Sequence, residues 1–135
     1  MTVKDTMAMI AGMTPELQPG LWVYCCLTDA GLIQSLAPKA FALIREAEGT
    51  TLILPADSAA THALAASPPM RLITLNVFSD LEGIGLTAAV AKALADKGIS
   101  CNVVAAFHHD HIFVPEDQAE PACAALLAAQ RAAKS

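Results

Sequence analysis

The sequence predicts an α+β protein that is built from two similar units. A motif of three apolar residues, Pro, any residue, Asp, any residue and Ala occurs at Leu52–Ala59 and again sixty residues later at Ile112–Ala119. Alanine-rich segments follow both copies. Such an internal repeat indicates that the chain is built from two similar structural units. With 135 residues, of which 55% are hydrophobic, the chain has material for one ordinary domain or for two small units sharing a core.

The second half of the chain predicts the order strand, helix, strand, strand, helix. Apolar and β-branched runs typical of strands alternate with segments whose apolar residues recur at helical spacing. We expect strands at Met70–Phe78, Ser100–Phe107 and His111–Val114, and helices at Gly85–Lys97 and from Asp117 to about Ala132. Gly98 follows the first of these helices, where a C-cap favours a residue that tolerates positive φ.

The first half predicts the same order of elements, but with a shortened first helix. We expect strands at Leu21–Leu27, Phe41–Glu48 and Thr51–Leu54, and helices at Val3–Met13 and Asp57–Ala66. Between the first two strands, Gly31 and Pro38 interrupt the segment in which a helix would stand, so we expect this helix to be shortened. The two units are then residues 1–68 and 69–135.

A β-α-β-β-α unit lacks one strand of the ferredoxin-like βαββαβ arrangement, which has an antiparallel sheet with its helices on one face. The strand at Met70–Phe78 cannot both close the first unit and open the second. At least one sheet must therefore take a strand from the other half of the chain or from a second chain. Because unpaired sheet edges favour association, we expect a side-by-side or dimeric arrangement.

Composition excludes several classes of function. The net charge is −5 with only eight Lys and Arg residues, so we expect neither nucleic acid nor a membrane as a partner. No run of about 18 apolar residues predicts a transmembrane helix, and the N-terminus does not resemble a signal peptide. The four cysteines, Cys25, Cys26, Cys101 and Cys123, form no CxxC pair, which favours reduced thiols in a cytoplasmic protein.

The segment Leu72–Leu126 resembles an ACT domain in its strand, acidic glycine loop, helix, Gly-Ile turn and strand carrying Asn. More narrowly, the chain resembles small bacterial proteins that consist of two ACT-like units and have no assigned function. The pieces that match are EAEGTTLILP, LEGIGLTAAVAKALADKGISCNVVA and HHDHIFVP. The resemblance implies a regulatory module that binds a small molecule, most often an amino acid, at an interface between units, as in the regulatory domains of aspartokinases.

The resemblance also implies a ligand site in the second unit. The family's Asp-x-Pro-Gly loop corresponds to Asp80-Leu81-Glu82-Gly83, in which Glu82 replaces the proline. The ligand-binding residues that this implies are Asp80, Leu81, Glu82, Gly83, Ile84, Gly85, Asn102 and Val103.

Physical chemistry favours a site in the same place. Glycines allow backbone N–H groups to turn towards a ligand before a helix, whose N-terminus accepts a carboxylate. The acids of the loop could receive an ammonium group, and Asn102 offers both a donor and an acceptor. An ordinary glycine loop with solvated acids is the alternative.

The segment Phe107–Pro115, FHHDHIFVP, holds three of the four histidines of the chain. A metal-dependent enzyme that uses the cluster His108–His111 is one interpretation. In the repeat, however, His108–Asp110 aligns with the turn between the first unit's paired strands, and zinc normally draws ligands from two separated segments. We therefore favour a turn and predict no metal site, no cofactor and no catalytic residue.

The sequence thus predicts a non-catalytic sensor of the ACT type that binds a small molecule, which we expect to be an amino acid, as a homodimer. Any regulated enzyme would be a separate partner. The alternatives are a structural or assembly module without ligand and the metal-dependent enzyme.

Overall fold

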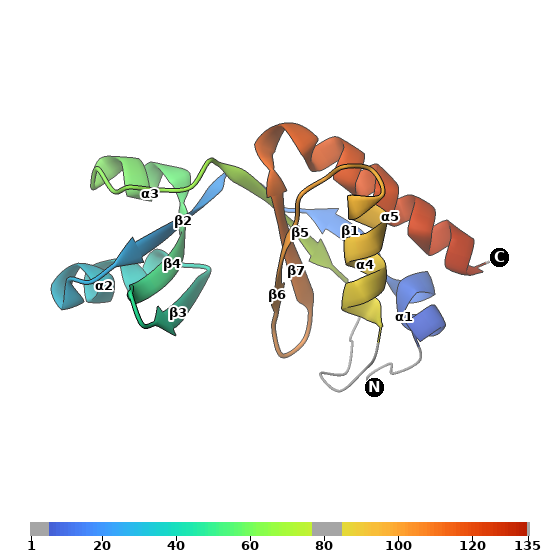
Figure 1. Ribbon diagram of the computed structural model, residues 1–135, viewed down its shortest axis with the longest axis horizontal. Coiled ribbons are helices and arrows are strands. Elements are labelled where there is room, and N and C mark those ends of the chain that lie inside the picture. The colour runs from blue at the N-terminus through green and yellow to red at the C-terminus, as the bar shows by residue number, and fades with distance from the viewer. Residues whose placement is uncertain (1–5, 77–84, 135) are drawn as a thin grey trace. The chain divides into compact units, whose positions relative to one another are not determined.

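The structure, a computed structural model, describes residues 6–76 and 85–134 (Figure 1). Contacts divide the chain into two compact units. Gly20–Met70 forms one, the continuous unit, and Met1–Pro19 together with Arg71–Ser135 forms the other, the discontinuous unit. Each unit is described by itself below.

The discontinuous unit is an antiparallel sheet with helices on one face. Its elements are α1 (Thr6–Gly12), β1 (Pro15–Leu17), β5 (Met70–Leu75), α4 (Leu86–Ala95), β6 (Asn102–Ala105), β7 (Asp110–Pro115), a 3₁₀ turn η2 (Glu116–Gln118) and α5 (Ala119–Lys134). The strand order is β1-β5-β7-β6. From β5 onward the elements follow the predicted β-α-β-β-α order, and β1 takes the place of the missing last strand.

The short strand β1 pairs antiparallel with β5, with Glu16 opposite Thr74. The pairing continues beyond the three residues of β1, because the Gln18 N–H donates to Leu72 O at 2.8 Å and the Asn76 N–H to Thr14 O at 2.9 Å. The discontinuous unit thus takes its last strand from the first part of the same chain. This is one of the two sources that the sequence left open.

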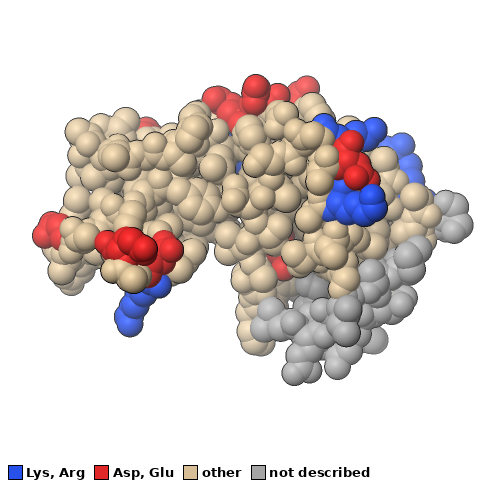
Figure 2. Space-filling model, in the orientation of Figure 1, with Lys and Arg blue, Asp and Glu red and all other residues tan. Residues whose placement is uncertain are grey.

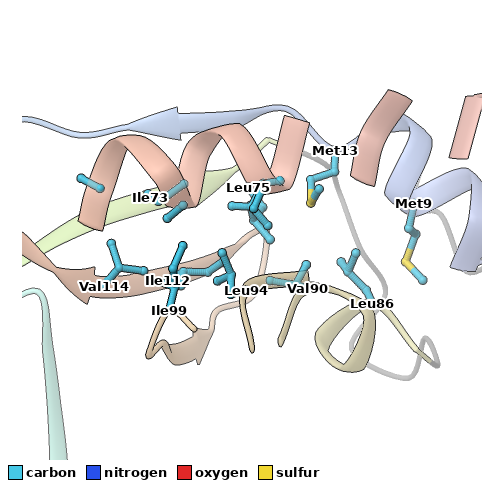
Figure 3. Close-up of a cluster of buried hydrophobic side chains, with 14 residues drawn as sticks. Met9, Met13, Ile73, Leu75, Leu86, Val90, Leu94, Ile99, Ile112 and Val114 are labelled. Carbon is cyan, nitrogen blue, oxygen red and sulfur yellow. The ribbon is translucent and has the colours of Figure 1, made fainter. Parts of the chain in front are cut away.

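The core of the discontinuous unit lies between its sheet and its helices (Figure 3). On β5 and β7 every second residue points into this core, as the period of a strand requires: Ile73 and Leu75 from one, Ile112 and Val114 from the other. The N-terminal segment adds Met9, which lies in α1, and Met13, which follows it, both with 0% of their surface exposed. Burial of such side chains stabilises the unit by roughly 1.5–3 kcal/mol each. The first segment of the chain is therefore part of this core.

Helix α4 forms and ends where the sequence indicates. Leu86, Val90 and Leu94 recur at helical spacing and are buried, while Thr87, Ala88 and Lys92 between them are exposed. At the C-terminal end the Ile99 N–H donates to Leu94 O at 3.0 Å, and Gly98 has a φ of 70°. The predicted role of Gly98 as a residue with positive φ at this C-cap is confirmed.

The continuous unit has the same pattern on a smaller scale. Its elements are β2 (Trp22–Leu27), α2 (Ala30–Leu36), a 3₁₀ turn η1 (Ala37–Lys39), β3 (Ala42–Glu46), β4 (Gly49–Pro55) and α3 (Ala56–Thr61), with strand order β3-β4-β2. Its buried core consists of Val23, Cys25, Leu36, Leu52, Leu54 and Ala59. Cys25 is buried and its neighbour Cys26 is exposed, because adjacent strand residues point to opposite faces.

The first helix of this unit is short, as the sequence predicts. Asp29 caps α2, since its Oδ2 accepts a hydrogen bond from the Leu32 N–H at 3.1 Å. Gly31 lies within α2, and Pro38 lies in the tighter turn η1 that follows it. The helix therefore starts despite Gly31 and ends before Pro38.

An extended segment borders β2 on the side away from β4. The Ser67 N–H donates to Tyr24 O at 3.0 Å, and the Tyr24 N–H donates to Ser67 Oγ at 2.9 Å. Two residues away on β2, Trp22 pairs with Met70. This segment occupies the place of a fourth strand, so both units have the predicted α+β, ferredoxin-like arrangement.

Among the described residues, no helix is both long enough and apolar enough to cross a membrane.

Candidate functional site

Three residues of the predicted ligand site lie in the described part of the chain: Gly85, Asn102 and Val103. The other five, Asp80, Leu81, Glu82, Gly83 and Ile84, lie outside the described residues.

Gly85 is the N-cap of α4 and has a left-handed backbone, with φ 101° and ψ −15°. Its carbonyl accepts the first bond of the helix, from the Ala89 N–H at 2.9 Å. A left-handed backbone at this position suits glycine because it has no Cβ. The first turn of α4 carries no acidic residue, so the partial positive charge of this helix end is not neutralised from within the helix. This end can accept a carboxylate or another small anion.

Asn102 and Val103 open β6, which is the edge strand of the discontinuous unit. Asn102 stands opposite Phe113 and is exposed, while Val103 stands opposite Ile112 and is half-buried. They follow the C-terminal end of α4, whereas Gly85 precedes its N-terminal end. A helix of 10 residues is about 15 Å long at roughly 1.5 Å per residue. The unit therefore does not bring Gly85 together with Asn102 and Val103.

The histidine-rich segment forms the turn between β6 and β7. The turn is closed by the Ala106 N–H, which donates to His109 O at 3.0 Å, and Phe107 at its tip is 77% exposed. The rings of His108 and His109 are 6.3 Å apart between centroids, and those of His109 and His111 are 6.5 Å apart. Within residues 6–76 and 85–134, no three His, Cys, Asp or Glu side chains are placed to hold a metal ion. The turn lies at the same end of this unit as the N-terminus of α4 (Figure 1).

A row of three polar side chains runs from Gln18, directly after β1, across β5 to β7. Gln18 Nε2 donates to Thr74 Oγ1 at 3.2 Å, and Thr74 Oγ1 lies 3.0 Å from His111 Nδ1. Thr74 and His111 alternate with core residues of their strands, so this polar row lies on the face of the sheet opposite the helices. Because Gln18 supplies the proton of the first bond, the Thr74 hydroxyl is free to donate to the Nδ1 of a neutral His111 ring.

Next to this polar row, Asn76 Nδ2 donates to Glu16 Oε2 at 2.7 Å. This bond also joins β1 to the end of β5, because Glu16 is the strand partner of Thr74. The N-terminal strand is thus held to β5 by side chains as well as by its backbone.

Burial shifts the pKa values of two neighbouring groups on β7. Burial raises the pKa of Asp110 above its usual range, and the charge of His111 offsets part of that rise. Burial lowers the pKa of His111, and His109 lowers it further, while the Asp110 carboxylate opposes both. Near neutral pH these shifts favour an uncharged His111, which agrees with its role as acceptor for Thr74.

The sequence interpretation missed Gln18 and Thr74. One signal was present, because Thr74 is a polar residue in the middle of the apolar run Met70–Leu75 and His111 alternates with apolar residues in its own strand. Gln18 gave no such signal, since β1 is three residues long and begins with a proline.

An apolar cavity of about 280 Å³ lies between α1, α4 and α5. Its lining consists of Ile10, Met13, Ala89, Val90, Ala129, Ala132 and Ala133. These side chains offer no partner for a carboxylate or an ammonium group. The cavity therefore does not suit a free amino acid, which needs both.

Comparison with known proteins finds the ACT domain twice in this chain, at residues 2–71 and at residues 69–128. The chain belongs to the ACT-domain family. The two matches are consecutive along the sequence. However, β1 lies in the first matched region and pairs with β5 in the sheet of the discontinuous unit. None of the curated proteins matches the chain.

Solved structures agree with this assignment. A Vibrio cholerae protein of unknown function, described as a possible transport protein, is 42% identical, with a TM-score of 0.83 over 92% of this chain and 94% of that chain. An Agrobacterium tumefaciens protein is 18% identical, with a TM-score of 0.74 over 87% and 89% of the two chains. The ligand-free regulatory subunit of aspartate kinase from Thermus thermophilus is 14% identical, with a TM-score of 0.67 over 87% and 97%. The last two likenesses concern the fold alone.

Proposed function

We propose that this protein is a non-catalytic regulator that binds a small molecule, an amino acid, and acts on a separate protein in the cytoplasm. The observation that carries the proposal is that ACT domains, which are regulatory modules, account for residues 2–128. The regulated activity is proposed to belong to another chain.

The proposed ligand site is centred on the N-terminus of α4. The helix end at Gly85, whose first turn carries no acidic residue, supports binding of the ligand's carboxylate. Asp80 and Glu82, which precede α4 in the sequence, are proposed to receive the α-ammonium group, with Leu81, Gly83 and Ile84 as neighbours in the same segment. An amino acid combines these two charged groups at a short fixed distance, which distinguishes it from a simple anion.

Asn102 and Val103 form a separate part of the proposal. They lie at the other end of α4, so one small ligand cannot contact them and Gly85 within one unit. Their contribution is therefore tested by a variant of its own.

Regulation would follow from a population shift. We propose that the chain forms a homodimer and that the ligand binds one arrangement of its subunits more tightly than another. A ligand shifts such an equilibrium only by its difference in affinity for the two arrangements. The site needs no cofactor for this role.

Thermal unfolding of the purified protein with each of the twenty amino acids tests the proposal. At about 100 times its dissociation constant, a ligand adds roughly 2.7 kcal/mol to the free energy of unfolding, which is several degrees for a chain of this size. We expect one amino acid to give this shift, and Asp80→Asn to abolish it. Asp57→Asn, which changes an exposed acid in the first turn of α3, is the matched control and should keep the shift.

The other outcomes separate the alternatives. A shift that survives in Asn102→Ala keeps the site at α4 and removes Asn102 from it. A shift with zinc alone, lost in His109→Ala, would replace the proposal by a metal-dependent function. No shift with any amino acid or metal would favour an assembly module that binds no ligand.

A further inference from the structure

We infer that the cavity between α1, α4 and α5 is a second binding site, which takes a small uncharged apolar molecule: an aromatic ring or a short hydrocarbon chain. The inference is independent of the proposed amino-acid site, because the two sites share no residue. The cavity is called the helix cavity below and is defined by its lining, Ile10, Met13, Ala89, Val90, Ala129, Ala132 and Ala133, all of the discontinuous unit.

The helix cavity has a closed floor and an open mouth. Met13 and Val90 are buried and therefore lie at its floor. Ile10 and Ala89 are half-buried, while Ala132 is exposed and marks the mouth. A small molecule can enter from solvent without unfolding of the unit, and most of its surface then becomes covered, as is usual for small-molecule sites.

The space exists because short side chains meet there. On α5, Ala129, Ala132 and Ala133 are three and four residues apart, so they share one face of the helix. Earlier on the same face, Leu126 is 0% exposed and fills the core. Beyond Leu126 the face carries methyl groups, and Ala89 adds another from α4. A larger residue at one of these alanine positions would fill the space.

The volume of the helix cavity suits a small hydrocarbon group. It measures about 280 Å³. An engineered cavity of about 150 Å³ lined by Leu, Ile and Phe, in an unrelated protein, is large enough to bind benzene. The helix cavity therefore has room for a ring or a chain of about six to ten carbon atoms.

The chemistry of the lining selects an uncharged ligand. The seven lining side chains consist of hydrocarbon groups and the thioether of Met13, so a carboxylate or ammonium group would lose its hydration there without a partner. The thioether is adaptable and makes favourable contacts with aromatic rings. Thr14 and Gln130, which follow lining residues in the sequence, bond to each other, with Gln130 Nε2 donating to Thr14 Oγ1 at 3.5 Å.

The charged groups near these helices stay at the surface. On α4, Lys92 Nζ lies 2.9 Å from Asp96 Oδ2, and the two side chains are 75% and 60% exposed. On the face seen in Figure 2, charged side chains stand in small separate groups, and most of the surface is uncharged. An apolar molecule therefore does not have to displace an ion pair to reach the cavity.

A molecule in the helix cavity would contact three segments that are far apart in the sequence: Ile10 on α1, Ala89 on α4 and Ala129 on α5. Binding would therefore hold the N-terminal segment against the other two helices. The Met13 N–H, which donates to Ile10 O at 3.2 Å, reports this contact, because its hydrogen exchange requires the segment to open. The docking of this segment would thus respond to an apolar molecule.

Titration of the full chain with toluene, followed by NMR of methyl groups, tests the inference. We expect toluene to shift the methyl resonances of Met13 and Ala133 and to leave those of Met70 and Ala124 unchanged. Exchange of the Met13 N–H should slow by about tenfold at roughly ten times the dissociation constant of toluene. Benzoate and benzylammonium carry a charge on the same ring and should cause neither change.

Variants that fill the cavity make the test specific. Ala129→Leu should weaken toluene binding roughly tenfold or more, because the added side chain occupies the space. Ala133→Leu, nearer the end of α5, is a second filling variant in case the first does not fold, which thermal unfolding checks. Ala124→Leu, at an exposed position of the same helix, is the matched control and should bind toluene like the unmodified protein.

The failures of the two binding proposals are distinguishable. Toluene binding that persists in Asp80→Asn would support a site separate from the one proposed for the amino acid. Unchanged resonances of Met13 and Ala133 with toluene, or equal changes with benzoate, would overturn the inference. Toluene binding that persists in both filling variants would also overturn it. None of these results would alter the response to amino acids, which is measured without toluene.

Discussion

Thr74 and His111 are 37 positions apart in the chain, and their side chains meet with 3.0 Å between Oγ1 and Nδ1. Thr74 also accepts a hydrogen bond from the side-chain amide of Gln18, so one hydroxyl group joins β5 to β7 and to the residue that follows β1. The strand that Gln18 follows, β1, comes from the other end of the sequence. The polar row therefore helps to hold β1, the strand that completes the sheet of this ACT domain, against β5.

Replacement of Thr74 by valine tests how much these two hydrogen bonds stabilise the pairing of β1 with β5. Valine has nearly the same shape, so the change removes the hydroxyl group and leaves the polar atoms of Gln18 and His111 without it. We expect the free energy of unfolding to fall by about 1–3 kcal/mol, the cost of leaving such groups unsatisfied. We also expect faster hydrogen exchange of the Gln18 backbone N–H, which is bonded to Leu72 O.

The control for this variant is Thr50→Val, at a half-buried threonine on β4 of the continuous unit. It should leave the exchange of the Gln18 amide as it is. Unchanged exchange in Thr74→Val would show that the backbone pairing of β1 holds without the polar row.

The polar row also makes stability depend on pH. Burial holds the pKa of His111 below its usual value near 6.5, so between 6.5 and the folded value the unfolded chain binds more protons. The free energy of unfolding should therefore be fully maintained above pH 6.5 and fall as the pH drops towards the folded pKa. His111→Asn should reduce this loss.

Denaturant unfolding of both proteins at a series of pH values between 7.5 and about 5 measures the effect. The raised pKa of Asp110 acts in the opposite direction at lower pH in both proteins, and loss of the His111 charge makes that rise larger in His111→Asn, which reduces the loss of stability further. His62→Asn removes an exposed imidazole beyond α3 and is the matched control. A loss of stability that is as steep in His111→Asn as in the unmodified chain would contradict this assignment.

Much of the fold could be predicted because it depends on local periodicity. The strand at β7 and the helix α4 show in the sequence as an apolar run before a proline and as apolar residues at helical spacing, and Gly98 marks where the helix ends. β1 could not be predicted, because Pro15–Leu17 carries no alternating pattern and owes its conformation to bonds with β5. Tertiary pairing, rather than propensity, determines this strand.

The candidate site could be predicted less completely for the same reason. Gly85 was identified because its neighbours in the sequence define the start of a helix, which is local information. The separation of Asn102 from Gly85 follows from the path of the chain along α4. The contact of Thr74 with Gln18 joins positions 56 apart, which no sequence window contains.

The N-terminal segment should stabilise the discontinuous unit through its core methionines, Met9 in α1 and Met13 directly after it. Met13 is 0% exposed, so Met13→Ala should lower the free energy of unfolding by about 2–5 kcal/mol through lost burial and the cavity it leaves. The single tryptophan, Trp22, belongs to the continuous unit and reports that unit by fluorescence. Circular dichroism reports both units.

If the units unfold separately, Met13→Ala should shift the transition seen by circular dichroism more than the one seen by Trp22 fluorescence. Met70→Ala, at a half-buried methionine where β5 begins, is the control and should cost less. An equal shift of both signals would show that the two units unfold as one.

Two glycines with opposite backbone requirements give the last prediction. Gly85 has a φ of 101° at the start of α4, where a side chain is strained, so Gly85→Ala should lower the free energy of unfolding by about 1–2 kcal/mol. Gly31 lies inside α2, and a Cβ there would meet no atom closer than 3.9 Å, from Asp29. Gly31→Ala should therefore raise stability by about 0.4–1 kcal/mol.

Thermal and denaturant unfolding measure the stability change in both variants, and each variant is the control for the other. If the N-terminus of α4 binds the ligand, Gly85→Ala should weaken the thermal shift by the responsive amino acid, because the strained cap moves the first N–H groups of the helix. Gly31→Ala should keep that shift. A Gly85→Ala protein that is destabilised but keeps the full ligand shift would place the carboxylate elsewhere than at this helix end.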